Sequence, residues 1–106
     1  MGILDLLGLA SKTNNIQEYV QKEAIILDVR TIEEYNGGHI IGSKNIALQI
    51  LTNEISEIKK WNKPIIACCR SGMRSAEATS LLNKNGINCI NGGGWQKLQD
   101  TLANLK

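Results

Sequence analysis

Apolar residues follow two patterns along this chain, and the two patterns alternate. Three short stretches are apolar almost without interruption, at 24–29, 65–68 and 87–90. Runs of this kind are typical of strands in a parallel sheet that is covered on both faces. Elsewhere apolar residues recur every three or four positions, which is the spacing of one helix face. This spacing predicts helices over 14–22, 48–60, 75–85 and 95–105.

Polar residues and glycines mark where these elements begin and end. Thr31 and Glu34 match the two halves of a capping box, so a short helix is expected from Thr31 to Tyr35. Residues 44–47 are expected to form a short strand or an extended connection, and the glycines at 92–94 to end the third apolar run. Strands and helices therefore alternate, which predicts an α/β domain with a mostly parallel central sheet and helices on both faces.

The size and charge of the chain limit its partners. Its 106 residues suffice for one core, and a net charge of +2 is too small to indicate binding to nucleic acid or a membrane surface. Residues 1–13 are interpreted as a helical extension and residues 14–106 as the domain. Ile3, Leu6 and Leu7 lie at helical spacing in the extension, which lacks the basic segment of a secretion signal. We therefore expect a cytoplasmic monomer.

The three cysteines do not form a disulfide framework, because their number is odd and no secretion signal is recognisable. A metal site is not expected either, since zinc sites need several cysteine or histidine ligands and His39 is the one histidine. We expect no cofactor. The cysteines are therefore candidates for thiol chemistry, and their surroundings indicate which one is reactive.

The segment from Cys69 to Ser75 carries the strongest chemical signal in the chain. It follows the second apolar run, so Cys69 lies at the carboxyl end of a strand, where folds of this class bind ligands. The thiolate is the reactive form of cysteine, and a helix N-terminus and nearby arginines lower the thiol pKa. Backbone N–H groups of the loop are expected to form an anion-binding nest. Cys69 is predicted to be a nucleophile, and the residues predicted to bind its substrate are Arg70, Ser71, Gly72, Met73, Arg74 and Ser75.

The residues of this loop are expected to differ in role. Arg70 is the expected substrate contact, while Arg74 orients the loop. Ser71 and Ser75 either bond the sulfur or cap the following helix, and capping is favoured for Ser75. Trp95, at the start of the last helix, is expected to pack as a lid over the core.

Structural roles are favoured for the other conspicuous residues. Strand alternation points Cys68 away from the loop, and Cys89 lies inside an apolar run, so both are expected in the core. Asp28 and Arg30 follow a buried strand, which favours a structural ion pair. His39 is interpreted as a hydrogen-bonded turn residue, because an ionised thiol needs no general base.

Several short motifs match the rhodanese family in identity, order and spacing. They are Leu-Asp-Val-Arg at 27–30, Glu-Glu-Tyr at 33–35, Gly-His-Ile at 38–40, Gly-Ser at 42–43 with Asn-Ile at 45–46, the loop at 69–75 and Gly-Gly-Trp at 93–95. From about residue 15 to 105 the chain thus resembles a single-domain rhodanese, a thiosulfate sulfurtransferase-like protein. The resemblance implies a rhodanese fold and an enzyme in which Cys69 takes sulfur from thiosulfate, or a similar small anionic donor, as a persulfide. The sulfur then passes to cyanide or to a thiol acceptor such as a small redox protein.

Two other functions remain open at this point. Counted from Cys68, the loop has the spacing of cysteine-dependent phosphatases and arsenate reductases, some of which share the rhodanese fold. Against this, Ala67 stands where many phosphatases have histidine, and no acid is placed to protonate a leaving group. The second alternative is a relay module that hands its persulfide to one specific protein partner.

Overall fold

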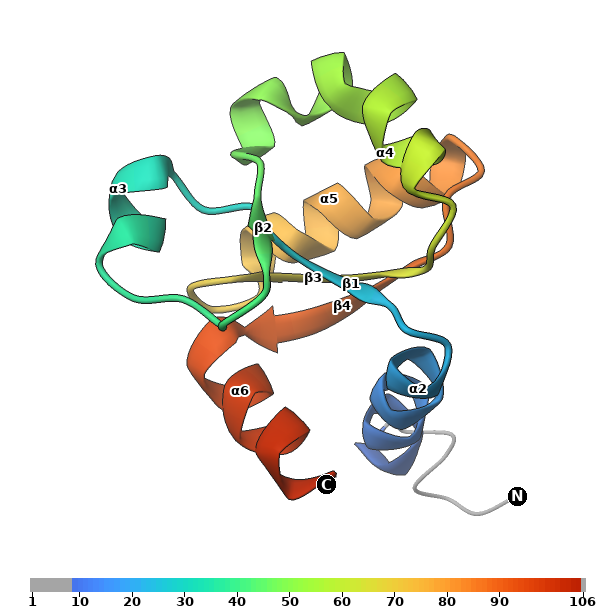
Figure 1. Cartoon of the computed structure of the whole chain (residues 1–106), viewed down its shortest axis with the longest axis vertical. Coiled ribbons are helices and arrows are strands. Elements are labelled where there is room, and N and C mark those ends of the chain that lie inside the picture. The colour runs from blue at the N-terminus through green and yellow to red at the C-terminus, as the bar shows by residue number, and fades with distance from the viewer. Residues whose placement is uncertain (1–8, 106) are drawn as a thin grey trace.

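The computed structural model describes residues 9–105, and the centre of the described chain is a sheet of four parallel strands (Figure 1). The strands lie in the order β2-β1-β3-β4, with bounds β1 (Ile25–Asp28), β2 (Lys44–Asn45), β3 (Ile65–Cys69) and β4 (Cys89–Gly94). Leu27 of β1 pairs with Lys44 on one side and with Ala67 on the other. The two most apolar strands, β1 and β3, therefore lie in the middle of the sheet.

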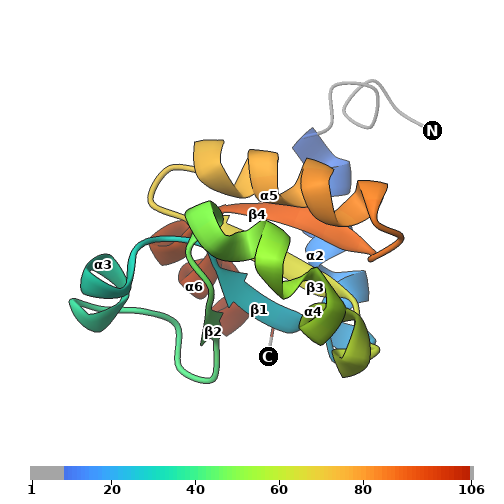
Figure 2. The same cartoon turned by 90° about the horizontal axis from the view of Figure 1, so that it is seen from above.

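Helices cover both faces of this sheet, as predicted (Figures 1 and 2). One face packs against the 3₁₀-helix η1 (Leu48–Glu54), α4 (Ile55–Trp61) and α5 (Met73–Lys84). The other face packs against α2 (Leu9–Gln21) and α6 (Trp95–Asn104). The short helix α3 (Ile32–Asn36) follows β1 and lies beyond the carboxyl end of that strand.

Side-chain alternation along β3 divides the core into two clusters. Ile65, Ala67 and Cys69 point to the α4 and α5 side, whereas Ile66 and Cys68 point to the α2 and α6 side. All five side chains are buried, and none is more than 1% exposed. A strand covered on both faces is apolar at every position, which explains the uninterrupted run in the sequence.

The glycines at 92–94 do not end the last strand, contrary to the prediction. β4 continues to Gly94, and its register against β3 shifts within this stretch. A β-carbon on Gly92 would lie 2.8 Å from Ile66 Cγ2 and 2.9 Å from Leu98 Cδ2. The strand therefore needs glycine because it is pressed between β3 and α6, a constraint that local propensity does not reveal.

The predicted short helix and short strand are both confirmed. Thr31 Oγ1 accepts a hydrogen bond from the Glu34 N–H at 3.2 Å, and Glu34 Oε1 accepts one from the Thr31 N–H at 3.0 Å. This is the expected capping box at the start of α3. In the 44–47 segment, two residues form the edge strand β2.

Some helix boundaries differ from the predictions. The helix expected over 14–22 begins at Leu9, and the first seven residues of the one expected over 48–60 are 3₁₀. Residues 1–8, which hold the apolar residues of the predicted extension, lie outside the described residues. The domain boundary after residue 13 stays a prediction, although α2 runs across it. Within the described chain, no helix combines the length and apolar character that a membrane crossing requires.

Candidate active site

Cys69 is the last residue of β3, and the loop that follows turns its N–H groups toward the sulfur. The Gly72 N–H donates to Cys69 Sγ at 3.0 Å, and the Ser75 N–H donates to it at 3.4 Å. Ser75 Oγ also lies 3.4 Å from the sulfur. The side chain is only 1% exposed, so Cys69 sits at the bottom of a polar cradle and not on the surface.

The loop favours the ionised form of Cys69. Burial raises the pKa of the Cys69 thiol, but hydrogen bonds from the Ser75 side chain and from the backbone of Ser75, Gly72 and Ser71 lower it by more. The pKa of Cys69 is consequently below its ordinary value of 9.0. The predicted nest is therefore present, and it acts on the cysteine that was expected to be reactive.

Glycines allow the loop and β4 to approach each other closely. Gly72 has a φ of +100° in the left-handed region and is the N-cap of α5. Its α-carbon is so near β4 that a β-carbon would lie 3.3 Å from Gly93 Cα. At the end of β4, a β-carbon on Gly94 would lie 2.8 Å from the Arg70 carbonyl oxygen. The glycines of β4 thus leave room for the backbone of the loop to pack directly against the strand.

Ser75 does not cap the helix, which corrects the favoured prediction for this residue. The N-cap is Gly72, and Ser75 is the third residue of α5 and fully buried. Its hydroxyl donates to Asn91 Oδ1 at 2.6 Å. The Asn91 amide also donates to the Gly72 carbonyl at 3.0 Å and accepts from the Gly93 N–H at 2.9 Å. Sequence reasoning missed Asn91, because its partners are brought to it only by the pairing of β3 with β4.

Arg74 is held by Glu34, a second residue that sequence reasoning did not place at the site. Arg74 Nη1 and Nη2 donate to the two Glu34 carboxylate oxygens at 2.7 and 2.9 Å. The Arg74 hydrogen bonds and the capping-box bonds from Thr31 lower the pKa of Glu34 from 4.5 to about 2. Arg74 therefore ties α5 to α3, in line with the expectation that it orients the loop.

The remaining loop side chains reach the solvent. Arg70 and Ser71 are exposed, and Met73 is 80% exposed. Within the described chain, the exposed Arg70 makes no ion pair, so its charge is available to an anion. The backbone of Ser71 helps to lower the pKa of Cys69.

The other two cysteines are core residues, as predicted. Cys68 is fully buried on the opposite face of the sheet, between α2 and α6, and burial raises its pKa to about 12. Cys89 is buried in the same cluster as Cys69, and burial raises its pKa as well. A buried thiol that resists ionisation is a poor nucleophile. The Cys68 side chain faces away from the loop, which argues against Cys68 as the nucleophile of a phosphatase-type loop.

The Asp28 and Arg30 pair is structural, as predicted. Arg30 Nη2 and Nε donate to the Asp28 carboxylate at 2.7 and 2.9 Å, and Arg30 Nη2 also donates to the Gly38 carbonyl at 2.7 Å. The guanidinium lies 4.8 Å from the centre of the Trp95 ring. The pair thereby fixes the chain after β1 against the start of α6. Trp95 packs over the second core cluster, close to its expected role.

His39 takes part in the turn after α3. Its Nδ1 is 2.8 Å from the Tyr35 carbonyl, and its ring stacks on the Tyr35 ring with centroids 3.8 Å apart. No set of three or more His, Cys, Asp or Glu side chains in the described residues is arranged to hold a metal ion.

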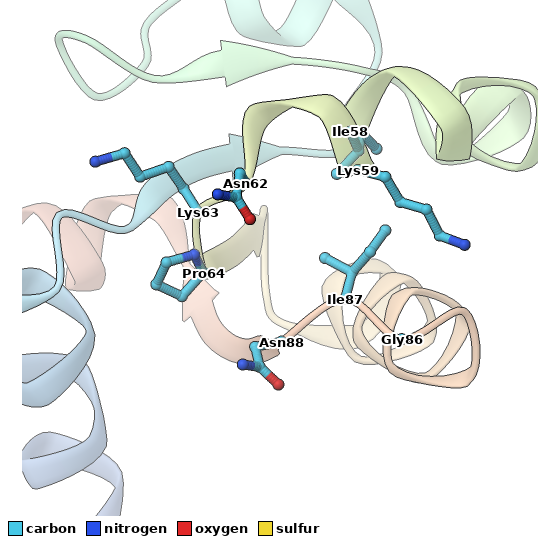
Figure 3. A pocket seen from close by; sticks show the side chains of 8 residues that line it. All are labelled: Ile58, Lys59, Asn62, Lys63, Pro64, Gly86, Ile87 and Asn88. Atoms are coloured by element: carbon cyan, nitrogen blue, oxygen red, sulfur yellow. The ribbon is translucent and has the colours of Figure 1, made fainter.

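A separate pocket of about 220 Å³ lies at the opposite end of the sheet (Figure 3). Its walls include Pro64, just before β3, and Asn88, just before β4. The ammonium ends of Lys59 and Lys63 point outward in opposite directions, and Lys63 is bound to Glu23 at 2.6 Å. Neither lysine directs its charge into the pocket, and the pocket is remote from Cys69. We therefore assign the chemistry to the loop at the carboxyl end of β3.

Comparison with known proteins identifies the class to which this fold and loop belong. The family model of the rhodanese-like domain matches residues 12–101. The chain belongs to the rhodanese-like family, and the parallel sheet with helices on both faces is the rhodanese fold.

Individual relatives support the same assignment. The chain is 38% identical over 78 residues to the uncharacterized protein YqhL of Bacillus subtilis, covering 72% of this chain and 61% of that protein. It is 33% identical over 67 residues to the thiosulfate sulfurtransferase GlpE of Pseudoalteromonas translucida, covering 63% of each. The chain therefore spans less than two thirds of the length of these relatives. A solved structure of a rhodanese with anions from E. coli is 28% identical, with a TM-score of 0.62 over 69% of this chain and 88% of that one.

Proposed function

We propose that this protein is a sulfurtransferase that carries sulfur as a persulfide on Cys69. The observation that carries the proposal is the cradle around Cys69 Sγ, in which the N–H groups of Gly72 and Ser75 donate at 3.0 and 3.4 Å. N–H groups aimed at one atom stabilise an anion at that atom. The cradle therefore serves the thiolate before the reaction and the charged outer sulfur after it.

The reaction follows from the ionised thiol. The Cys69 thiolate attacks the outer sulfur of thiosulfate or a similar anionic donor, a new S–S bond forms, and sulfite leaves with the electron pair of the broken bond. A thiolate acceptor then attacks the outer sulfur of the persulfide, and the Cys69 thiolate departs. Arg70, the exposed residue that follows Cys69 in the chain, is the proposed contact for the donor anion. His39 is not proposed as a base, because the hydrogen bonds of the loop already lower the pKa of the Cys69 thiol.

Intact-protein mass spectrometry after incubation with thiosulfate tests the proposal. We expect a gain of one sulfur atom, about 32 Da, in the unmodified chain and in Cys68→Ser, and no gain in Cys69→Ser. Cys68→Ser is the matched control, because it makes the same change at the adjacent position on the other face of the sheet. Loading that persists in Cys69→Ser would refute the proposed persulfide.

Turnover distinguishes an enzyme from a relay module. With thiosulfate and a small thiol such as dithiothreitol as acceptor, a sulfurtransferase produces many equivalents of sulfite per protein. A relay module loads one sulfur and stops until its own partner is added. We expect repeated turnover, since the charged Arg70 and the cradle require nothing of the acceptor beyond a thiolate that reaches the loop.

A further inference from the structure

The side-chain amide of Asn91 has a single orientation that fits its neighbours. Its oxygen accepts from the Gly93 N–H at 2.9 Å, and its nitrogen donates to the Gly72 carbonyl at 3.0 Å. A flipped amide would place N–H against N–H at Gly93 and oxygen against oxygen at Gly72. The atom that faces Ser75 Oγ at 2.6 Å is therefore the amide oxygen, which can only accept.

This orientation determines where the Ser75 hydroxyl hydrogen lies. A hydroxyl has one hydrogen, and here it is donated to Asn91. Ser75 Oγ consequently turns its lone pairs toward Cys69 Sγ, 3.4 Å away. A neutral Cys69 thiol can donate its own hydrogen to that oxygen, which completes a chain from Cys69 through Ser75 to Asn91. A thiolate has no hydrogen to donate and faces an oxygen lone pair until the hydroxyl turns around.

We propose that Asn91 is a positioning residue for Cys69: it accepts the Ser75 hydroxyl hydrogen while Cys69 is a thiol and releases it to the sulfur when Cys69 ionises. The exchange leaves no buried acceptor without a partner, because Asn91 Oδ1 keeps the Gly93 N–H. Meanwhile the bond from Asn91 to the Gly72 carbonyl holds Gly72 in the conformation that aims its N–H at the sulfur.

The role of the exchange in turnover rests on the proposed function. When the thiolate becomes a persulfide, the inner sulfur loses its charge to the outer sulfur, so the Ser75 hydroxyl is free to return to Asn91. The hydrogen bond given up by Asn91 on ionisation is thus regained on loading. Asn91 therefore destabilises the free thiolate relative to the loaded state, which increases the nucleophilicity of Cys69.

A double-mutant cycle on the pKa of Cys69 tests the exchange without any sulfur transfer. The pH dependence of iodoacetamide alkylation at Cys69, located by mass spectrometry, is measured for the unmodified chain, Ser75→Ala, Asn91→Ala and the double variant. None of these substitutions changes Arg70 or Arg74, the two charged residues of the loop, or Glu34, which pairs with Arg74 in the unmodified chain.

The cycle has a definite expected sign. With Asn91 present, the hydrogen bond that Ser75 donates to the thiolate replaces the one it donated to Asn91, so the net stabilisation of the thiolate is small. Ser75→Ala should then raise the pH midpoint of alkylation by only about 0.4 pH units. Without Asn91 nothing offsets it, and Ser75→Ala raises the midpoint by about 1 pH unit. A residue that merely held the loop in place would produce the opposite coupling, because a loosened loop would disengage Ser75 from the sulfur.

The matched control is Asn83→Ala. Asn83 also ties α5 to β4, accepting from the Cys89 N–H and donating to the Cys89 carbonyl, both at 3.1 Å, and these side-chain bonds do not involve the loop at 69–75. The Ser75→Ala effect should be the same in this background as in the unmodified chain. Should Asn91→Ala fail to fold by circular dichroism, Asn91→Val replaces it under the same criterion.

If Ser75→Ala shifts the alkylation midpoint in Asn91→Ala by the same amount as in the unmodified chain, or by less, the inference is overturned, whatever the loading experiment shows. Conversely, failure of Cys69 to take sulfur from thiosulfate counts against the proposed function and leaves the alkylation cycle intact. The two proposals can therefore fail separately.

Discussion

The bond between Glu34 and Arg74 predicts a loss of stability with a characteristic pH dependence. Glu34→Gln removes the charge that receives two hydrogen bonds from Arg74, at 2.7 and 2.9 Å. Glutamine still suits its capping-box position, so the helix start is largely preserved. The substitution therefore isolates the tie between α3 and the active loop.

The magnitude follows from the pKa of Glu34 and its exposure. A lowering from 4.5 to about 2 sets an upper limit of about 3.4 kcal/mol, at about 1.36 kcal/mol per pKa unit. The side chains of Glu34 and Arg74 are 30% and 35% exposed, so water screens the pair. We therefore expect Glu34→Gln to lower the free energy of unfolding at pH 7 by about 1–2 kcal/mol.

The sign of the pH dependence is also determined. The folded-state pKa of Glu34 is depressed, so its contribution is fully present above pH 4.5 and is lost as the pH falls toward about 2. The difference in stability between the unmodified chain and Glu34→Gln should therefore shrink over this interval. Urea unfolding followed by tryptophan fluorescence at pH 7, 5 and 3 measures it.

The control for this experiment is Glu33→Gln, in the same first turn of α3. Glu33 is exposed, and its side chain forms no ion pair with the part of the chain that the structure describes. Both variants lose one negative charge near the helix N-terminus. They differ in the Arg74 bond and in the Thr31 capping-box bonds, which glutamine at position 34 can retain. Equal unfolding free energies for the two variants at pH 7 would refute the reasoning, as would a difference that persists undiminished at pH 3.

Two further substitutions test the packing that supports the site. Gly92→Ala should lower the free energy of unfolding by about 1–3 kcal/mol, because its β-carbon would lie 2.8 Å from Ile66 Cγ2. Thermal unfolding compares it with Gly37→Ala, whose new β-carbon has no contact closer than 3.4 Å. Equal melting temperatures for the two variants would contradict the prediction. Asp28→Asn leaves the buried Arg30 charge without its counterion and should lower the free energy of unfolding in urea by about 3 kcal/mol. A loss below about 1 kcal/mol, the size expected of an exposed pair, would show that the buried Arg30 does not need the Asp28 charge.

The position of Cys69 could be predicted because the relevant signals are local. Strand alternation separates Cys68 from Cys69, and the residues that follow Cys69 supply both the turn and the helix start. The capping box of Thr31 and Glu34 spans only three residues, and it forms as expected. The parallel arrangement of the sheet likewise follows from apolar runs alternating with helical spacing.

What the sequence did not reveal depends on contacts between distant segments. Asn91 lies 16 residues from Ser75, and Glu34 lies 40 residues from Arg74, so no local pattern joins them. The glycines of β4 were misread for the same reason. Taken alone, three glycines indicate a break in a strand, whereas here the neighbouring strand and loop exclude side chains.

The placement of the three cysteines has a consequence for the lifetime of a sulfur carried on Cys69. Cys68 faces the other side of the sheet, and Cys89 is buried with a raised pKa. Cys89 also pairs with Ile65, at the far end of β3 from Cys69. Neither of these two thiols is therefore placed to remove the sulfur as an internal disulfide forms. A loaded molecule would keep its persulfide sulfur until an external thiol reacts with it. The concentration of that acceptor, and not the rate of an intramolecular reaction, would then set the half-life of the loaded state.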